Sequence, residues 1–293
     1  MKHIAKKSKN SHIHKKDVPP ISELRQDIVS GDWILVAPAR MMRPEFFVKK
    51  EKSAEYILPK NKCPFENPQK SGNAPPVLVY QNKTGSDWFL QVIPNKYPAV
   101  GPGKCGIIKR EGIYSAQAGT GSHEIVILRD HDKHPAQYKK EDIRSLLLGY
   151  QDRYRSLSCE ECVAYISIFH NYGREAGASV PHPHSQILAL PVVPPDVSHS
   201  LNGSREYFHK HGECIHCVML SNELKAKRRI VFQNKKAVVF APYASRSNFE
   251  LRIFPKRHEA YFEKVNKDGP IPALFLFLKI NISLQIKMEE TEK

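Results

Sequence analysis

The sequence predicts an α+β fold made of two related sheet-and-helix units. Strand-length runs rich in β-branched and aromatic residues recur along the chain, and one long amphipathic segment between them has helical periodicity. A shorter cycle of the same kind follows toward the C-terminus. The 293 residues, 41% of them hydrophobic, suffice to bury one large or two ordinary domain cores. We therefore expect a globular protein in two parts.

The first twenty residues predict a flexible basic tail, because they are polar and Lys-rich and end in Pro19-Pro20. The chain has no apolar run of 18 residues, and its N-terminus lacks the apolar segment of a secretory signal. We therefore expect no membrane span and, by default, a cytoplasmic location.

The first unit is expected over residues 21–195. Its helix is predicted at residues 139–157, where apolar side chains recur at helical spacing and Glu141 and Asp142 occupy the first turn. Strands are predicted within residues 32–38, 87–100, 123–130, 162–171 and 185–191.

The second unit is expected over residues 196–293. It comprises a hairpin at 229–245 that turns at Asn234-Lys235, a strand at 249–258 and a helix at 272–288. The pair Cys214-x-x-Cys217 followed by strands resembles Cys63 followed by strands, which suggests an internal duplication. No histidine-bearing strand follows Met288, so the second unit is expected to be C-terminally shortened.

The net charge of +15 would suit nucleic acid, an acidic surface or a phosphorylated substrate. The lysines are dispersed, and no aromatic platform accompanies them. A solvated basic surface is favoured over a nucleic-acid site.

The six cysteines favour thiols or metal ligands over disulfides, because two Cys-x-x-Cys pairs occur in an apparently cytosolic chain. Cys63 has Glu66 where a zinc knuckle would place a second cysteine, so a lone buried cysteine is the competing interpretation. Histidines that could complete a site there are His123, His131, His134, His182 and His184. Cys214 and Cys217, with His258 downstream, favour a second metal site.

The segment "VPHPHSQIL" carries the most specific chemical signal. On a strand, His182, His184 and Gln186 would share one face. A solvent-facing polar row is the alternative, but the apolar flanks make unpaired imidazoles costly there. Because a neutral imidazole serves as a metal ligand or as a nucleophile, the two histidines could divide these roles.

Small residues just before this row, among them Gly173, Gly177 and Ser179, would let a backbone approach a phosphate. Arg40 and Arg43 could offer bidentate donors to a phosphate or diphosphate, although surface arginines are the ordinary alternative. The spacing is neither that of a Walker loop nor that of a Rossmann fingerprint.

Residues 21–265 resemble the galactose-1-phosphate uridylyltransferase family, the transferase branch of the histidine-triad superfamily. The segments that carry the resemblance occur in the family's order: "SGDWILVAPARMMRP", "CPFENP", "IPNKYPAV", "RDHDKH", "FHNYGREAGASVPHPHSQILALP" and "FELRIFPKRHEAYF". The resemblance implies a histidine-triad-like fold of two antiparallel-sheet-plus-helix units.

The resemblance also implies residue roles. His184 matches a nucleophile that attacks the α-phosphorus of a nucleoside diphosphate sugar, and Gln186 replaces the third histidine of hydrolytic relatives, which favours transfer over hydrolysis. Positions matching zinc ligands are Cys63, Glu66, His131 and His182, and those matching a second metal site are Cys214, Cys217 and His258. Positions matching nucleotide and phosphate contacts are Arg40, Arg43, Asn95, Asn171 and Ser179.

The activity implied is UDP-glucose:hexose-1-phosphate uridylyl transfer, with zinc as cofactor, a nucleoside diphosphate sugar and a sugar 1-phosphate as partners, and a homodimer as the assembly. An ADP-sugar or dinucleoside-polyphosphate phosphorylase is the alternative enzyme. A non-catalytic zinc-stabilised nucleotide-binding protein is the alternative outside enzymology. Family members continue beyond the equivalent of Lys293, so the sugar-exchange half of the reaction is expected to be impaired.

Overall fold

A computed structural model describes residues 22–36, 58–106, 108–133, 137–173 and 176–265. The predicted tail, the predicted helix at 272–288, and Arg40 and Arg43 lie outside these ranges. Within them, a five-stranded and a three-stranded antiparallel sheet are each accompanied by helices, which confirms the predicted α+β class. None of the described helices is long and apolar enough to cross a membrane.

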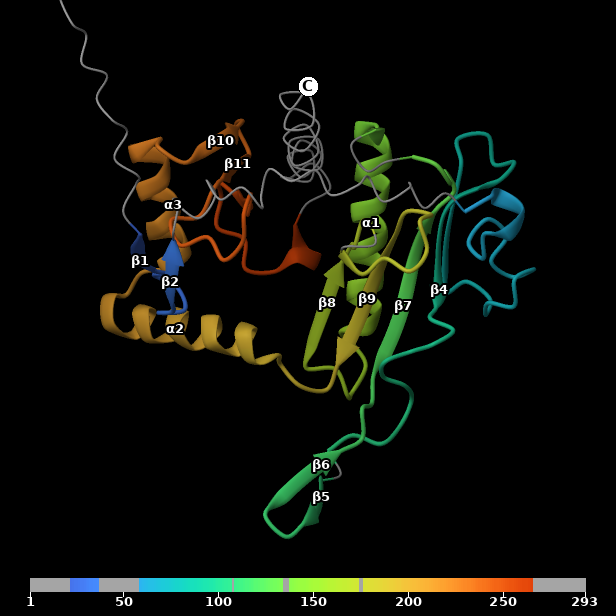
Figure 1. Ribbon diagram of the computed structural model, residues 1–293, viewed down its shortest axis with the longest axis horizontal. Coiled ribbons are helices and arrows are strands. Elements are labelled where there is room, and N and C mark those ends of the chain that lie inside the picture. Colours follow the sequence, from blue (N-terminus) through green and yellow to red (C-terminus); the bar gives the residue numbers. More distant parts are fainter. Residues whose placement is uncertain (1–21, 37–57, 107, 134–136, 174–175, 266–293) are drawn as a thin grey trace, which may run out of the picture.

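The larger sheet has five antiparallel strands in the order β3-β4-β7-β9-β8 (Figure 1). The strands are β3 (Leu78–Gln81), β4 (Trp88–Pro94), β7 (Ser122–Leu128), β9 (His184–Leu190) and β8 (Tyr165–Phe169). Strands β4, β7 and β9 were predicted within a few residues of these bounds. Strand β9 lies between β7 and β8, so its side chains are flanked on both sides by neighbouring strands.

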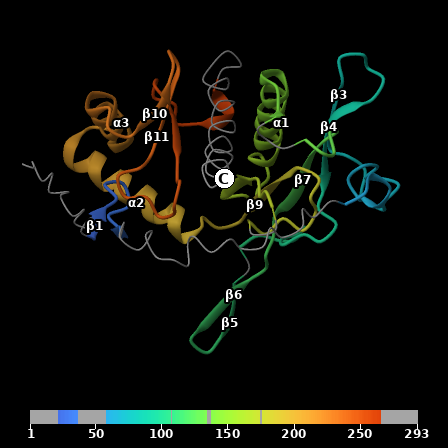
Figure 2. The ribbon, with the colours of Figure 1, turned by 45° about the horizontal axis from the view of Figure 1, so that its top comes forward.

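One face of this sheet is covered by helix α1 (Lys140–Leu157), as Figure 2 shows. The helix begins where the Asp142 carboxylate accepts a hydrogen bond from the Lys139 backbone N–H. Its buried residues Ile143, Leu146 and Leu147 pack with strand residues that include Val126 and Ile187. This core is the main apolar contact that holds β7 and β9 in place.

The opposite face of the sheet carries a smaller core. Cys63 and Phe65, which follow the 3-10 helix η3 (Lys60–Lys62), pack there against Ile93, Ile125 and Ile127. The loop at residues 58–73 therefore lies on the sheet face that α1 leaves uncovered.

The second unit consists of α2 (Pro195–His211), α3 (Ile215–Ala226) and a three-stranded sheet. Its strands are β10 (Ile230–Gln233), β11 (Ala237–Phe240) and β12 (Arg252–Pro255). The hairpin turns as predicted, with the Asn234 side-chain oxygen accepting two backbone N–H bonds. A helix, and not a strand, directly follows Cys214, so the expected likeness to the chain after Cys63 is wrong at this point.

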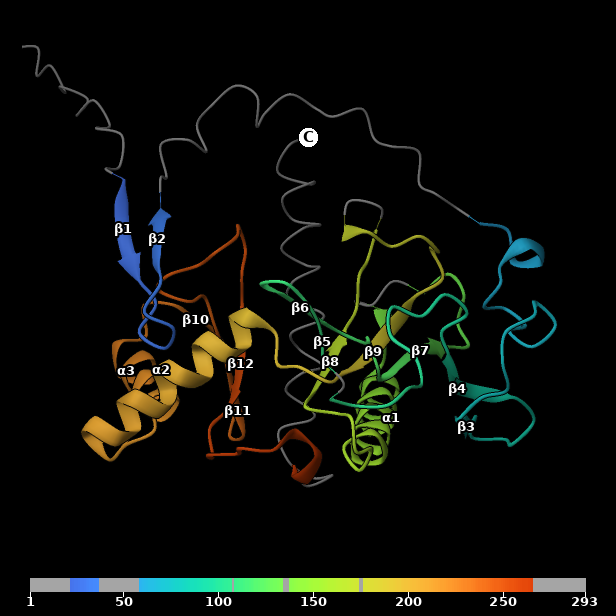
Figure 3. The ribbon, with the colours of Figure 1, turned by 90° about the horizontal axis from the view of Figure 1, so that it is seen from below.

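An N-terminal hairpin of β1 (Glu23–Gln26) and β2 (Trp33–Val36) contacts the second unit, although the sequence placed it with the first (Figure 3). Arg252 pairs with Asp27 at 3.0 Å, and Arg246 pairs with Asp32 at 2.7 Å. Periodicity alone could not show these contacts, because more than two hundred residues separate the partners.

A second hairpin, β5 (Ile108–Glu111) and β6 (Tyr114–Gln117), projects from the body (Figure 1). Beside its base, Cys105 is joined to Cys162 in a disulfide with the Cα atoms 5.3 Å apart. The prediction that all six cysteines are thiols or metal ligands is therefore wrong for this pair. Sequence spacing gave no signal for it, because the two residues are 57 positions apart.

Candidate active site

Strand β9 divides its side chains between the two faces of the sheet, as predicted. His184 is paired with Ile127 and Gln186 with Ile125, both on the face that α1 leaves uncovered. Ser185 lies on the other face, where its hydroxyl meets the Tyr150 hydroxyl of α1 at 2.5 Å. The polar row is therefore not a solvent-facing strand surface, because His184 itself is buried.

The His184 ring is held in one tautomer. Its Nδ1 lies 2.9 Å from the His182 carbonyl oxygen, which only accepts hydrogen bonds. Nδ1 therefore carries the proton, and Nε2 keeps its lone pair. Burial lowers the pKa of His184, so the imidazole is neutral at pH 7, and the Phe65 ring packs edge-on 5.0 Å away. A neutral imidazole with a free Nε2 lone pair is a nucleophile.

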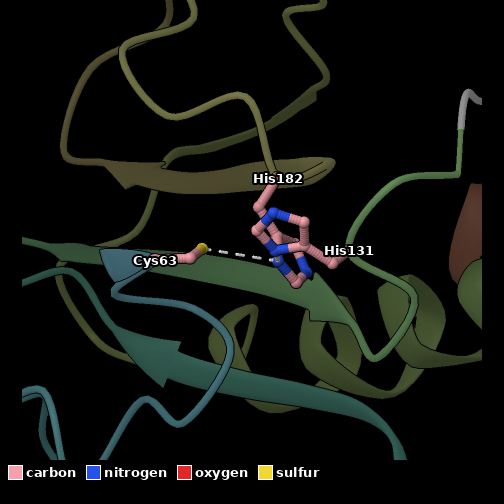
Figure 4. Close-up of side chains that lie close together, drawn as sticks. All are labelled: Cys63, His131 and His182. Atoms are coloured by element: carbon pink, nitrogen blue, oxygen red, sulfur yellow. Dashed lines mark hydrogen bonds between the residues drawn. The ribbon is translucent and has the colours of Figure 1, made fainter. Parts of the chain in front are cut away.

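His182 enters a buried cluster with Cys63 and His131 (Figure 4). The Nδ1 atoms of the two histidines are 3.1 Å apart, and Cys63 Sγ lies 3.6 Å from His182 Nδ1. Burial lowers the pKa of His182 to about 4, so this ring is neutral at pH 7.

Backbone carbonyls fix both rings of this cluster. His182 Nε2 donates to the Leu128 carbonyl at 2.7 Å, and His131 Nε2 donates to the Leu58 carbonyl at 2.8 Å. An imidazole that donates through Nε2 and carries a single proton presents a lone pair on Nδ1, and the two Nδ1 atoms face each other and the sulfur. Converging lone pairs repel unless a proton or a cation lies between them, and two nitrogens with one sulfur are a donor set that zinc prefers.

Glu66 supplies a fourth oxygen to this cluster. Its Oε1 accepts a 2.8 Å hydrogen bond from Arg129, whereas its buried Oε2 has no hydrogen-bond partner among the described residues and lies 3.5 Å from His131 Nδ1. An orphaned carboxylate oxygen beside three converging donors fits a tetrahedral metal ion. The residues predicted as zinc ligands are thus brought together by the fold.

Gln186 contacts His123, whose role the sequence did not reveal. His123 Nε2 lies 2.8 Å from Gln186 Oε1, and the Ala99 backbone N–H donates to His123 Nδ1 at 3.0 Å. The Asn95 amide lies 3.1 Å from the same Nε2, so the loop after β4 and strand β9 meet at this ring. The signal in the sequence was the position of His123, which shares a strand face with Ile125. From the sequence, His123 is interpreted only as a candidate metal ligand.

The remaining predicted contacts are more dispersed. Asn171 is half-buried after β8, and a Cβ added to Gly177 would lie 4.0 Å from its amide nitrogen. Ser179 is exposed in the loop that leads into β9. Their role in binding a nucleotide stays a prediction.

The three residues of the second predicted metal site also lie close together. Potential ligand atoms of Cys214, Cys217 and His258 lie within 4.8 Å of one another, and Cys217 Sγ is 3.1 Å from His258 Nδ1. Cys214 precedes the first turn of α3, and His258 follows β12. Cys217 and His258 are exposed, in contrast to the buried first cluster.

Sequence comparison agrees with this arrangement. Residues 11–194 match the family described as galactose-1-phosphate uridyl transferase, N-terminal domain. An ADP-glucose phosphorylase from Arabidopsis thaliana is 34% identical over 250 residues, which cover 83% of this chain and 68% of that protein. A galactose-1-phosphate uridylyltransferase from Thermotoga maritima is 27% identical over 249 residues, which cover 84% and 70% of the two chains.

Solved structures share the fold. The crystal structure of an ADP-glucose phosphorylase from Arabidopsis thaliana with bound ADP-glucose superposes with a TM-score of 0.73 at 28% identity, covering 92% of this chain and 79% of that one. A uridylyltransferase structure gives a TM-score of 0.62 at 30% identity, covering 89% and 74%. The resemblance read from the sequence is confirmed, and so is the histidine-triad-like architecture. The chain belongs to the galactose-1-phosphate uridylyltransferase family.

Proposed function

We propose that this chain is a nucleotidyltransferase in which His184 carries the nucleotide covalently. The observation that carries the proposal is the fixed tautomer of a buried, neutral ring, with Nδ1 bonded to the His182 carbonyl and Nε2 without a hydrogen bond to any described residue. Nε2 attacks the α-phosphorus of a nucleoside diphosphate sugar, a nitrogen–phosphorus bond forms, and the bond to the sugar 1-phosphate breaks. A phosphate oxygen of an acceptor then attacks the same phosphorus and restores the free imidazole.

The hydrogen bond from Nδ1 acquires a second role in this scheme. When Nε2 bonds to phosphorus, the ring becomes cationic, and the His182 carbonyl stabilises the proton that remains on Nδ1. Gln186, two residues away on the same strand face, can donate to phosphoryl oxygens but has no titratable proton to offer a leaving group. Both features suit transfer between phosphates.

Zinc is the cation that we propose for the cluster of Cys63, Glu66, His131 and His182. Bound there, zinc would supply structural cross-linking by fixing the segment that leads into β9. The chain's own contribution is the pair of backbone carbonyls, from Leu58 and Leu128, that turn both Nδ1 atoms inward.

ADP-glucose is the donor that we favour, with inorganic phosphate as acceptor. The support is the 34% identity to an ADP-glucose phosphorylase and the TM-score of 0.73 to one that holds ADP-glucose. UDP-glucose with a hexose 1-phosphate acceptor is the second candidate, supported by the family profile and by the uridylyltransferase from Thermotoga maritima. The proposed homodimer and the cytoplasmic location stay predictions.

Intact-mass spectrometry tests the common step and the donor together. Zinc-replete protein is incubated separately with ADP-glucose and UDP-glucose, and the mass of an added nucleoside monophosphate is sought. We expect an adduct that is abolished by His184→Ala and retained by His209→Ala, which alters an exposed histidine on α2. The absence of an adduct with both donors, or its survival in His184→Ala, would overturn the proposal.

A further inference from the structure

We propose that His123 is a positioning residue that sets the orientation of the Gln186 amide, so that Gln186 presents its NH2 group, and not its carbonyl oxygen, to the transferred phosphoryl group. The inference rests on the proposed function, because it assigns how one residue of that site is aimed.

Sheet geometry brings the two side chains together. In the antiparallel pairing of β7 with β9, His123 is opposite Leu188 and Ile125 is opposite Gln186. His123 is therefore a diagonal neighbour of Gln186 on one face, at a separation that long side chains bridge. The observed distance of 2.8 Å between His123 Nε2 and Gln186 Oε1 is that of a hydrogen bond.

The backbone decides which atom of the imidazole carries the proton. The Ala99 N–H can only donate, and it points at His123 Nδ1 from 3.0 Å, so Nδ1 is the acceptor of the ring. In a neutral ring the proton is then on Nε2, which must donate to Gln186. The Gln186 side chain therefore accepts this hydrogen bond through Oε1, and its NH2 group points away from His123.

The neighbouring amide does not reverse this assignment. Asn95 Oδ1 accepts from the Tyr97 N–H at 2.9 Å, which fixes the Asn95 amide with its NH2 toward His123. That NH2 also lies 3.5 Å from Nδ1, the acceptor of the ring, so it does not require a lone pair on Nε2. Ala99 thus donates a hydrogen bond to His123, and His123 in turn donates one to Gln186.

The consequence is chemical. With the amide held this way, Gln186 is a hydrogen-bond donor to phosphoryl oxygens, whose charge redistributes as the nitrogen–phosphorus bond forms. If the amide were free to rotate, its oxygen would face those phosphoryl oxygens part of the time and repel them. His123 therefore acts through Gln186 and not on the substrate.

A double-mutant cycle in single-turnover experiments tests this, with the rate of nucleotidyl-His184 formation as the measurement. His123→Phe removes the donor and keeps a planar ring, and we expect the rate at saturating donor to fall about tenfold to thirtyfold. In a Gln186→Ala background, the same substitution is expected to change the rate less than about twofold, because the group that it positions is gone. His123→Gln, which offers an NH2 donor, is expected to recover part of the rate.

Metal content and the unfolding midpoint are measured for each variant, and both are expected to match the wild type. A matched control, His209→Phe, should leave the rate unchanged. An equal loss from His123→Phe in both backgrounds, or no loss in either, would overturn the role of His123 while leaving the wild-type adduct in place. If the wild-type protein forms no adduct, it is the proposed function that fails.

Discussion

Two cysteine–histidine clusters in this protein have similar ligands but different surroundings. Cys63, His131 and His182 are buried between the large sheet and the loop at residues 58–73. In the second cluster, Cys217 and His258 are exposed. The first cluster is thus part of a core, whereas the second joins a helix start to the chain after a strand.

The difference lies in what fixes each side chain. Both imidazoles of the first cluster are tied through Nε2 to backbone carbonyls, so their lone pairs converge even without an ion. In the second cluster, the thiol of Cys217 lies 3.1 Å from His258 Nδ1. Buried metal-binding atoms that lack a partner destabilise the fold, because they are removed from water. Exposed ones are solvated by water instead. The first cluster should therefore govern stability and catalysis, and the second should act locally.

The largest effect is expected from His182→Ala. The change removes a fully buried ring, leaves the Leu128 carbonyl without its partner and takes away one ligand of the proposed metal site. We expect the free energy of unfolding to fall by about 3 kcal/mol or more, with loss of the proposed zinc and of the proposed His184 adduct. Urea unfolding and elemental analysis check this, and a stable, zinc-bearing variant would contradict the assignment.

A smaller effect is expected from Cys217→Ser. Cys217 is exposed, so the free energy of unfolding should change by less than about 1 kcal/mol. The rate of His184 adduct formation should stay at the wild-type value, and any metal of the second cluster should be lost. A loss of adduct formation as large as that in His182→Ala would break the contrast between the two clusters.

The smallest effect concerns Asp27, which ties the β1–β2 hairpin to β12 near the second cluster. Burial alone would raise its pKa, but hydrogen bonds from the Val29 and Ser30 N–H groups and from Arg252 outweigh it and hold the pKa below its usual value. The stabilisation is therefore present above about pH 4 and is lost as the pH falls through the lowered pKa.

Asp27→Asn checks this prediction. The variant should lose about 1 kcal/mol of unfolding free energy at pH 7, and its difference from the wild type should narrow as the pH drops from about 5 to 3. Urea titrations at both ends of that range measure the difference. A constant difference across the range would show that the Asp27 charge contributes nothing.

Local patterns predicted the parts of the fold that depend on neighbours in sequence. Alternation in "HSQILAL" correctly separated His184 from Ser185, and helical spacing placed α1 within one residue of its start. Partners that are distant in sequence were not predictable in this way. The disulfide of Cys105 with Cys162 and the contact of Arg252 with Asp27 depend on how the finished units meet.

The site shows the same division. The ligand set of the first cluster came from a family pattern that spans the chain, and the fold brings its members together. The bond between His123 and Gln186 is not predictable from the sequence, because it requires the register of β7 on β9, which single-strand periodicity does not fix.

The attachment of residues 262–265 to α1 affects when the core of the large sheet is completed during synthesis. The Gln151 side chain, fully buried, donates to the carbonyls of Phe262 in η6 (Phe262–Lys264) and of Val265. Val265 also belongs to the core between α1 and the large sheet. During synthesis, the core beneath the large sheet is therefore complete only once residue 265 has been made, so we expect the first unit to reach its full stability late.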